Sequence, residues 1–164
     1  MLKKLTLGLL VVLLGLTAPL SIQASDLDIS ETVVMRPIAD GVSMDDAIDS
    51  MKLRANNLNM MFVAHQPLSR QIMAMGFDSR RIEIFQFCDP LVAKQMVEED
   101  MLFAAYMPCR IALVEDQHGR GWLVQMDLDY FTRVAKLTPE SKQLADEVRD
   151  KLAEIVEAGV SGEL

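Results

Sequence analysis

Short runs in which hydrophobic and polar residues alternate are separated along the chain by segments with helical spacing. Alternation with a period of two is typical of strands, whereas apolar residues three and four positions apart are typical of helices. The alternating runs predict strands at 31–36, 58–65, 81–87, 108–115 and 121–127. The last two strands flank the turn sequence DQHG, and this arrangement predicts a β-hairpin.

Three capping signals mark where the longer helices begin. Ser43, Asp89 and Thr138 are expected to act as N-caps, because their side-chain oxygens can accept hydrogen bonds from the first helical turn. Proline directly follows Asp89 and Thr138, at the first helical position, where it is well tolerated. The last helix is expected to extend over about 138–159, and a shorter helical turn is expected over 67–76.

The order of these elements decides the expected fold class. A hairpin requires antiparallel pairing, so we expect an α+β fold with a mainly antiparallel sheet and helices packed on one face. A doubly wound parallel sheet is the weaker alternative. The chain shows no repeat and no internal linker, and its length suits a single domain.

Strand alternation places both cysteines of the chain on apolar faces. Cys88 directly follows the strand predicted at 81–87 and continues its face with Ile82 and Ile84. Cys109 lies in the next predicted strand and shares its face with Ile111 and Leu113. We expect the helices to pack on these faces. If the two strands are neighbours, the thiols can meet in the core.

The two thiols leave three interpretations open. They can form a disulfide, which would close a loop of about 22 residues and stabilise the fold by about 3 kcal/mol. They can be unbonded core residues, since free cysteine is often buried. They can also be a reactive pair, because Cys88 directly precedes a helix N-terminus, which lowers a thiol pKa, although the charge of Asp89 opposes the thiolate.

The N-terminus has the pattern of a secretory signal peptide. Lys3 and Lys4 precede an apolar run over 5–20, and we expect cleavage after Ala24. The run of about 16 residues is shorter than the roughly 20 that a membrane-spanning helix needs, so an uncleaved anchor is the weaker alternative. The remaining domain, 25–164, is then expected in the periplasm or outside the cell.

The charge of the chain limits its partners. The net charge is −8, and removal of 1–24 changes it to −10 because that segment contains two lysines and no acidic residue. This charge argues against binding to nucleic acid and against stable association with an anionic membrane surface.

A methionine-rich strand suggests a weaker candidate metal site. Met60 and Met61 precede His65, and soft thioethers with an imidazole could hold copper(I) or an axial haem position. Alternation puts the two methionines on opposite faces, and methionine is an ordinary core residue, so this interpretation has less support than simple packing.

Other candidate catalytic groups are sparse. Asp127 and Asp129 flank Leu128 and could form a carboxylate pair, but a turn is the more economical interpretation. His118 is expected to be a solvated loop residue in the DQHG turn. The chain has no glycine-rich phosphate loop, no serine nucleophile motif and no zinc-ligand spacing.

Three segments together resemble a known family. They are GFDSRRIEIFQFCDPLVAKQM, YMPCRIALVED and GWLVQMD, and over about 61–131 they resemble the domain of unknown function 302 family. The resemblance implies a small α+β domain with an antiparallel sheet that can associate as a dimer, and it implies no activity. The residues that match the family pattern are Glu83, Cys88, Asp89, Pro90, Pro108 and Cys109.

The sequence therefore favours an exported protein that binds a small ligand or a partner. It shows no recognisable catalytic constellation, which argues against an enzyme without deciding the question. The first alternative is a thiol redox or sulfur-carrying protein that uses Cys88 and Cys109, and the second is copper or haem binding through methionine and histidine. The sequence does not specify a cofactor. An antiparallel sheet with open edges also leads us to expect a homodimer.

Overall fold

The strands form one antiparallel sheet in the order β1-β5-β4-β3-β2. The computed structural model describes residues 28–163. Every neighbouring pair of strands is antiparallel, and β4 and β5 form the expected hairpin. The strands are β1 (Val33–Pro37), β2 (Met61–Gln66), β3 (Ile82–Cys88), β4 (Cys109–Glu115) and β5 (Gly121–Met126).

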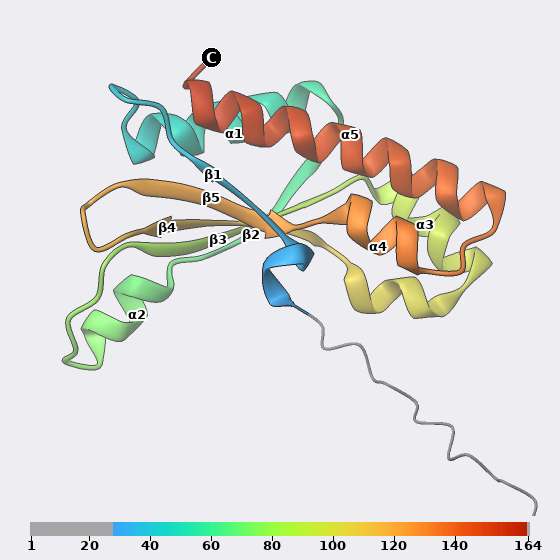
Figure 1. Ribbon diagram of the computed structural model, residues 1–164, viewed down its shortest axis with the longest axis horizontal. Helices are drawn as coiled ribbons and strands as arrows, with labels where there is room; N and C mark the ends of the chain where they lie inside the picture. The colour runs from blue at the N-terminus through green and yellow to red at the C-terminus, as the bar shows by residue number, and fades with distance from the viewer. Residues whose placement is uncertain (1–27, 164) are drawn as a thin grey trace, which may run out of the picture.

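The two longest helices lie side by side over one face of the sheet (Figure 1). The helices are α1 (Met44–Asn57), α2 (Leu68–Ala74), α3 (Pro90–Glu99), α4 (Leu128–Val134) and α5 (Pro139–Ser161). There are also two 3₁₀ helices: η1 (Ile29–Thr32) precedes β1, and η2 (Met101–Tyr106) lies between α3 and β4. Helices α3 and α4 lie beside one half of α5, whereas the short α2 lies apart from the other helices (Figure 1). The expected α+β class, with an antiparallel sheet and helices packed against it, is confirmed.

The predicted helix starts are confirmed. Ser43, Asp89 and Thr138 each accept a hydrogen bond from a backbone N–H in the first turn of the helix that follows. Each N-terminus would otherwise leave unpaired N–H groups, so these three side chains fix where α1, α3 and α5 begin. The last helix continues two residues beyond the predicted end and stops at Gly162, which has a positive φ of 71°.

Two boundaries and one element differ from expectation. Strand β1 begins at Val33 because η1 occupies the preceding residues, and β2 begins only at Met61. Helix α4 was not predicted. It begins because Asp127 accepts a hydrogen bond from the Tyr130 N–H at 3.0 Å, so an acidic residue interpreted as part of a turn is an N-cap.

The core lies between the sheet and the pair α1 and α5. Its fully buried side chains come from both layers, namely Met51, Met60, Phe85, Phe87, Ile111, Leu113, Leu123 and Ile155. The helices approach closely at Gly159, where an added Cβ would lie 2.6 Å from Met51 Cγ and 2.7 Å from Leu123 Cδ1. A side chain at this position would therefore push α5 away from α1 and the sheet.

The predicted inner face is right for β4 and wrong for β3. In β4, Ile111 and Leu113 point into the core as expected. In β3 the buried residues are Glu83, Phe85 and Phe87, while the aliphatic residues of the other face are only half-buried. Both faces of β3 carry apolar residues, so alternation alone could not tell which face the helices cover. In α3 the apolar character of Leu91 favours burial, but Leu91 is 72% exposed and its neighbour Val92 is buried instead.

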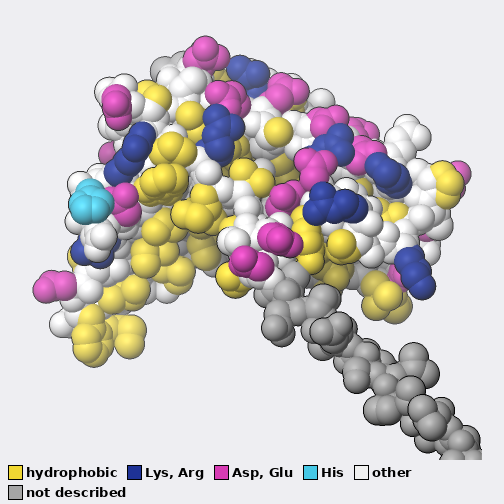
Figure 2. All heavy atoms as spheres, viewed as in Figure 1, with side chains coloured by type: hydrophobic (Ala, Val, Ile, Leu, Met, Phe, Trp, Pro, Cys, Tyr) yellow, Lys and Arg dark blue, Asp and Glu magenta, His cyan; other side chains and the backbone are white. Residues whose placement is uncertain are grey.

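Hydrophobic side chains also remain on the surface. Figure 2 shows them gathered in the region where Figure 1 places α2 and the ends of its neighbouring strands. Met73, Met75 and Phe77, in and just after α2, are among the exposed apolar residues. This region contrasts with the surface of α5, where charged side chains of both signs are frequent (Figure 2).

The expected signal peptide at 1–24 lies outside the described residues. None of the helices within 28–163 is both long enough and apolar enough to cross a membrane.

Candidate functional site

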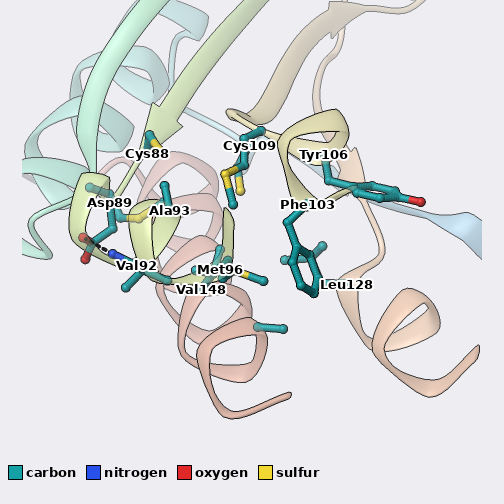
Figure 3. Close-up of a pocket in the computed structure, with 13 residues that line it drawn as sticks. Cys88, Asp89, Val92, Ala93, Met96, Phe103, Tyr106, Cys109, Leu128 and Val148 are labelled. Atoms are coloured by element: carbon teal, nitrogen blue, oxygen red, sulfur yellow. Dashed lines mark hydrogen bonds between the residues drawn. The ribbon is translucent and has the colours of Figure 1, made fainter. Parts of the chain in front are cut away.

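A small cavity lies where β3 ends and β4 begins. Helices α3 and α5 and the 3₁₀ helix η2 surround these strand ends (Figure 3). The cavity has a volume of about 90 Å³, and its lining is almost entirely apolar. A space of this size suits a single ion or a group of a few atoms.

Sulfur atoms come from several separate elements to line this cavity. Both cysteines contribute, and so do three methionines: Met60, just before β2; Met96, on α3; and Met107, just before β4. Met60 is only 1% exposed and Met96 is also buried. Met60 falls in the strand predicted at 58–65, and no sequence signal associated Met60 or Met96 with the cysteines.

The strand register places the two cysteines close together but not face to face. Phe87 pairs directly with Cys109 across β3 and β4, so Cys88 is one residue out of register with Cys109. Strand alternation alone would put successive residues on opposite faces, but β3 ends at Cys88, and both cysteines line the same cavity. Figure 3 shows Cys88 at the end of β3 and Cys109 at the start of β4. Both are free thiols, and the disulfide interpretation is not supported.

Burial keeps both thiols protonated. It raises the pKa of Cys109 to about 11; the neighbouring Cys88 adds to this effect and Arg110 opposes it. Burial also raises the pKa of Cys88, and the negative charge of Asp89 raises it further. Since the thiolate is the nucleophilic form, neither thiol is activated for attack in the empty cavity.

An ion pair closes one side of the cavity. Lys151 Nζ on α5 donates to Asp89 Oδ2 at 2.8 Å, and both side chains are largely buried. Burial opposes ionisation of Asp89, but the hydrogen bond and charge of Lys151 and the backbone N–H groups of α3 outweigh it and lower its pKa. Because the two residues are far apart in the sequence, no local signal could have indicated this pair.

An open surface groove adjoins the cavity. Met60, Asp89 and Val92 line both hollows, and the groove continues outward to residues such as Lys52 and Phe62. The wall between them is therefore only one side chain thick.

The opposite end of β3 holds a buried carboxylate. Glu83 is 4% exposed, and its Oε2 lies 2.5 Å from His65 Nε2. Arg81 Nε donates to the other oxygen of Glu83, and Arg81 Nη2 donates to Asp45 Oδ1 at 2.6 Å. Burial opposes ionisation of Glu83, but the hydrogen bonds and charges of Arg81 and His65 outweigh it and hold its pKa below the ordinary value. The i, i+2 spacing of Arg81 and Glu83 is the one sequence signal for this network.

The structure does not bring the three candidate metal ligands of the methionine-rich strand together. His65 contacts Glu83 and stacks on the Phe85 ring with 4.6 Å between ring centroids. Met61 is 59% exposed on β2, whereas Met60 points into the cavity with the cysteines. The imidazole and the buried thioether thus belong to different parts of the molecule.

The remaining candidates have separate structural contacts. Asp127 caps α4, and Asp129 forms an ion pair with Arg149 at 3.1 Å, so each carboxylate has its own partner. His118 is exposed in the hairpin turn, and its backbone N–H donates a hydrogen bond to the carboxylate of Asp116.

A family model matches most of the chain. The model is that of the domain of unknown function DUF302, and it covers residues 37–159. The chain belongs to the DUF302 family. The match contains the shorter range of the resemblance seen in the sequence and extends it to α1 and α5. The family-pattern residues lie at both ends of β3, with Glu83 at one end and Cys88, Asp89, Pro90, Pro108 and Cys109 at the other.

A solved structure has the same fold. It is the crystal structure of an uncharacterized conserved DUF302 protein from Bacillus stearothermophilus, with a TM-score of 0.67 and 15% sequence identity. The similarity covers 77% of this chain and 97% of that one. At this identity the likeness concerns the fold alone. No curated protein matches this chain.

Proposed function

We propose that this DUF302 protein is a binding protein that takes a small ligand into the sulfur-lined cavity. One observation carries the proposal: two free thiols and three thioethers converge on an apolar hollow that is separated from an open groove by a single layer of side chains. Ordinary core packing leaves few voids larger than a water molecule. The size of the cavity favours an ion or a small group over a haem.

Binding has more support than thiol redox or sulfur-transfer chemistry. A reactive thiol needs a lowered pKa, from a nearby cation or a helix N-terminus. Here burial raises the pKa of both thiols, Arg110 only partly opposes this for Cys109, and Lys151 is paired with Asp89. The start of α3 is likewise capped by Asp89 rather than directed at Cys88.

Alkylation of the folded chain tests whether the cavity is open to solutes. Iodoacetamide is small and neutral, and in prolonged incubation at mildly alkaline pH we expect it to modify both thiols of the native protein, slowly because their raised pKa leaves little thiolate, as mass spectrometry can follow. Ala93→Leu, which adds volume at the cavity wall, is expected to slow the modification of Cys109. Ala153→Leu, at an exposed position of α5, is the matched control and should leave the rate unchanged. Thiols that react only in denaturant would show a sealed core and refute the proposal.

We also propose that binding takes place outside the cytoplasm, after removal of residues 1–24. The n-region, apolar run and Ala24 support this. The intact mass of the protein from a periplasmic extract should correspond to a chain that begins at Ser25. A mass that retains Met1 to Ala24 would contradict the proposal.

We further propose that two copies associate through the edge strand β2. Its exposed side chains include Met61, Phe62 and Val63. This apolar edge offers unpaired backbone groups to a second copy on either side of the register shift between Phe62 and Ala64. Light scattering at micromolar concentration should give the mass of a dimer. Val63→Lys should convert it to a monomer, and a monomeric mass of the unchanged chain would overturn the proposal.

A further inference from the structure

We infer that the ligand of the cavity is copper(I), bound by the sulfur atoms of Cys88 and Cys109 with the thioether of Met60 as a further ligand. This inference rests on the proposed function of the same cavity. The donor atoms that the fold gathers, the donors that it keeps away and the groove that adjoins the cavity support this inference.

The donor set is soft. Thiolates and thioethers suit copper(I), zinc and iron–sulfur clusters, whereas carboxylates, carbonyls and water suit magnesium, calcium and manganese. The cavity is lined by five sulfur-bearing side chains and one carboxylate, that of Asp89, which forms an ion pair with Lys151. Within residues 28–163, no group of three or more His, Cys, Asp and Glu side chains is placed to hold a metal ion. A structural zinc site, which takes four such ligands, is therefore not available there.

The positions of the sulfur residues follow from the fold. Met61 pairs with Cys88 across β2 and β3, and Phe87 pairs with Cys109 across β3 and β4. Met60, the residue before this pairing begins, therefore lies at the same end of the sheet as both cysteines. Met96 on α3 lines the same cavity from the helix side, as Figure 3 shows for Met96 and Cys109. Donors from a loop, two strands and a helix thus converge without any local sequence motif.

Apolar surroundings suit this ion. Copper(I) can be coordinated by two or three sulfur ligands alone, so it needs no water in its coordination shell and can bind in a dry cavity. The step is a ligand exchange: two S–H bonds break, two Cu–S bonds form, two protons leave to solvent, and no electron is transferred. Metal binding to thiols releases protons in this way. The groove beside Met60 and Asp89 supplies the path for the ion and for the protons.

Competition with a chelator tests the inference. The reduced full chain is titrated without oxygen against the copper(I) complex of bathocuproine disulfonate, and loss of its colour measures transfer. We expect one copper(I) per chain and new near-ultraviolet absorption from copper–thiolate bonds. Cys88→Ser and Cys109→Ser should each weaken binding by about 100-fold or more, since each removes a thiolate ligand. Zinc(II), offered to the same chain against a zinc chelator, should be held far more weakly.

The methionines supply a matched pair of variants. Met60→Leu keeps the volume of the buried side chain and removes only the sulfur, so the fold is expected to persist and the affinity to fall by about tenfold. Met61→Leu makes the same change one residue away, at an exposed position outside the cavity, and should leave the affinity unchanged. Thermal unfolding of both variants checks that they are folded. This pair keeps the test decisive even if a cysteine variant fails to fold.

The outcomes separate this inference from the proposed function. A chain that removes no copper(I) from the chelator, that holds zinc(II) as tightly, or that loses as much affinity through Met61→Leu as through Met60→Leu overturns the copper assignment. If iodoacetamide still enters the cavity in that case, and Ala93→Leu still slows it, the binding function stands with another ligand. Exclusion of the reagent together with a lack of copper binding would overturn both.

Discussion

Strand β3 buries polar or ionisable groups at both ends, and the two ends treat them in opposite ways. At its start, Glu83 is buried between Arg81 and His65, and these partners hold its pKa below the ordinary value although burial opposes ionisation. At its end, Cys88 and the neighbouring Cys109 have no such partner, and burial raises the pKa of both. Burial is thus outweighed at one end, where the pKa falls, and is not outweighed at the other, where the pKa rises.

The difference shows that the neighbours of a buried group decide whether its pKa falls or rises from the ordinary value. An opposite charge within hydrogen-bonding distance favours the ionised form, and an apolar wall disfavours it. The Glu83 end is thus internally satisfied, because each carboxylate oxygen already has a donor. The cysteine end has soft donors without partners, which is why we place the ligand there.

The largest expected effect comes from removing the carboxylate. Glu83→Ala leaves Arg81 and His65 without their shared acceptor in a largely buried position. Breaking a buried ion pair by removing one partner costs 3–5 kcal/mol, and we expect about 3 kcal/mol because Arg81 keeps Asp45. The free energy of unfolding in urea measures this loss.

A surface ion pair provides the control for that variant. Glu157 pairs with Arg36 at 2.7 Å, and both side chains are exposed. Glu157→Ala should therefore change the free energy of unfolding by about 1 kcal/mol or less. Equal losses for the two variants would show that the buried interactions of Glu83 contribute no more to stability than a surface ion pair.

The cysteine end should respond to polarity rather than to charge. Cys109→Ser keeps the size of the side chain but places a hydroxyl among apolar neighbours, which costs roughly 1–3 kcal/mol without a hydrogen-bond partner. Cys109→Ala leaves only a small void, at a cost on the order of 1 kcal/mol. In denaturant unfolding, the Cys109→Ser variant should thus be less stable than the Cys109→Ala variant. The reverse order would mean that the position is hydrated or hydrogen-bonded.

The acid range should separate the two ends further. The folded-state pKa of Glu83 lies below its ordinary value of 4.5, so Glu83 contributes stability that is present above 4.5 and is lost as the pH falls through the folded-state value. The difference in unfolding free energy between the unchanged chain and Glu83→Gln should therefore shrink on acidification. A constant difference from neutral to acid pH would contradict the lowered pKa.

The smallest expected effect is the coupling between the cysteines. Since both are free thiols, Cys88→Ala and Cys109→Ala should each cost on the order of 1 kcal/mol, and the double variant should lose about the sum. A disulfide would instead give equal losses of about 3 kcal/mol that do not add. Denaturant unfolding under oxidising conditions is the measurement. Losses that do not add would support the disulfide interpretation.

Several features could be predicted from the sequence because their physical causes are local. The caps at Ser43, Asp89 and Thr138 act within one helical turn, and the DQHG hairpin depends on a few adjacent residues. Helix α4 shows the limit of such signals. Its N-cap, Asp127, is the same kind of residue that favours a turn, so the sequence supported both interpretations.

The sequence by itself determined the caps, the hairpin, the α+β class and the family to which the chain belongs. Only the tertiary structure decided which face of β3 the helices cover, that His65 meets Glu83, and that Met60 and Met96 join the cysteines around one cavity. The physical reason is range. Capping and turn energies act between residues a few positions apart, whereas the inner face and the cavity depend on strand register and on helices that pack from distant parts of the chain.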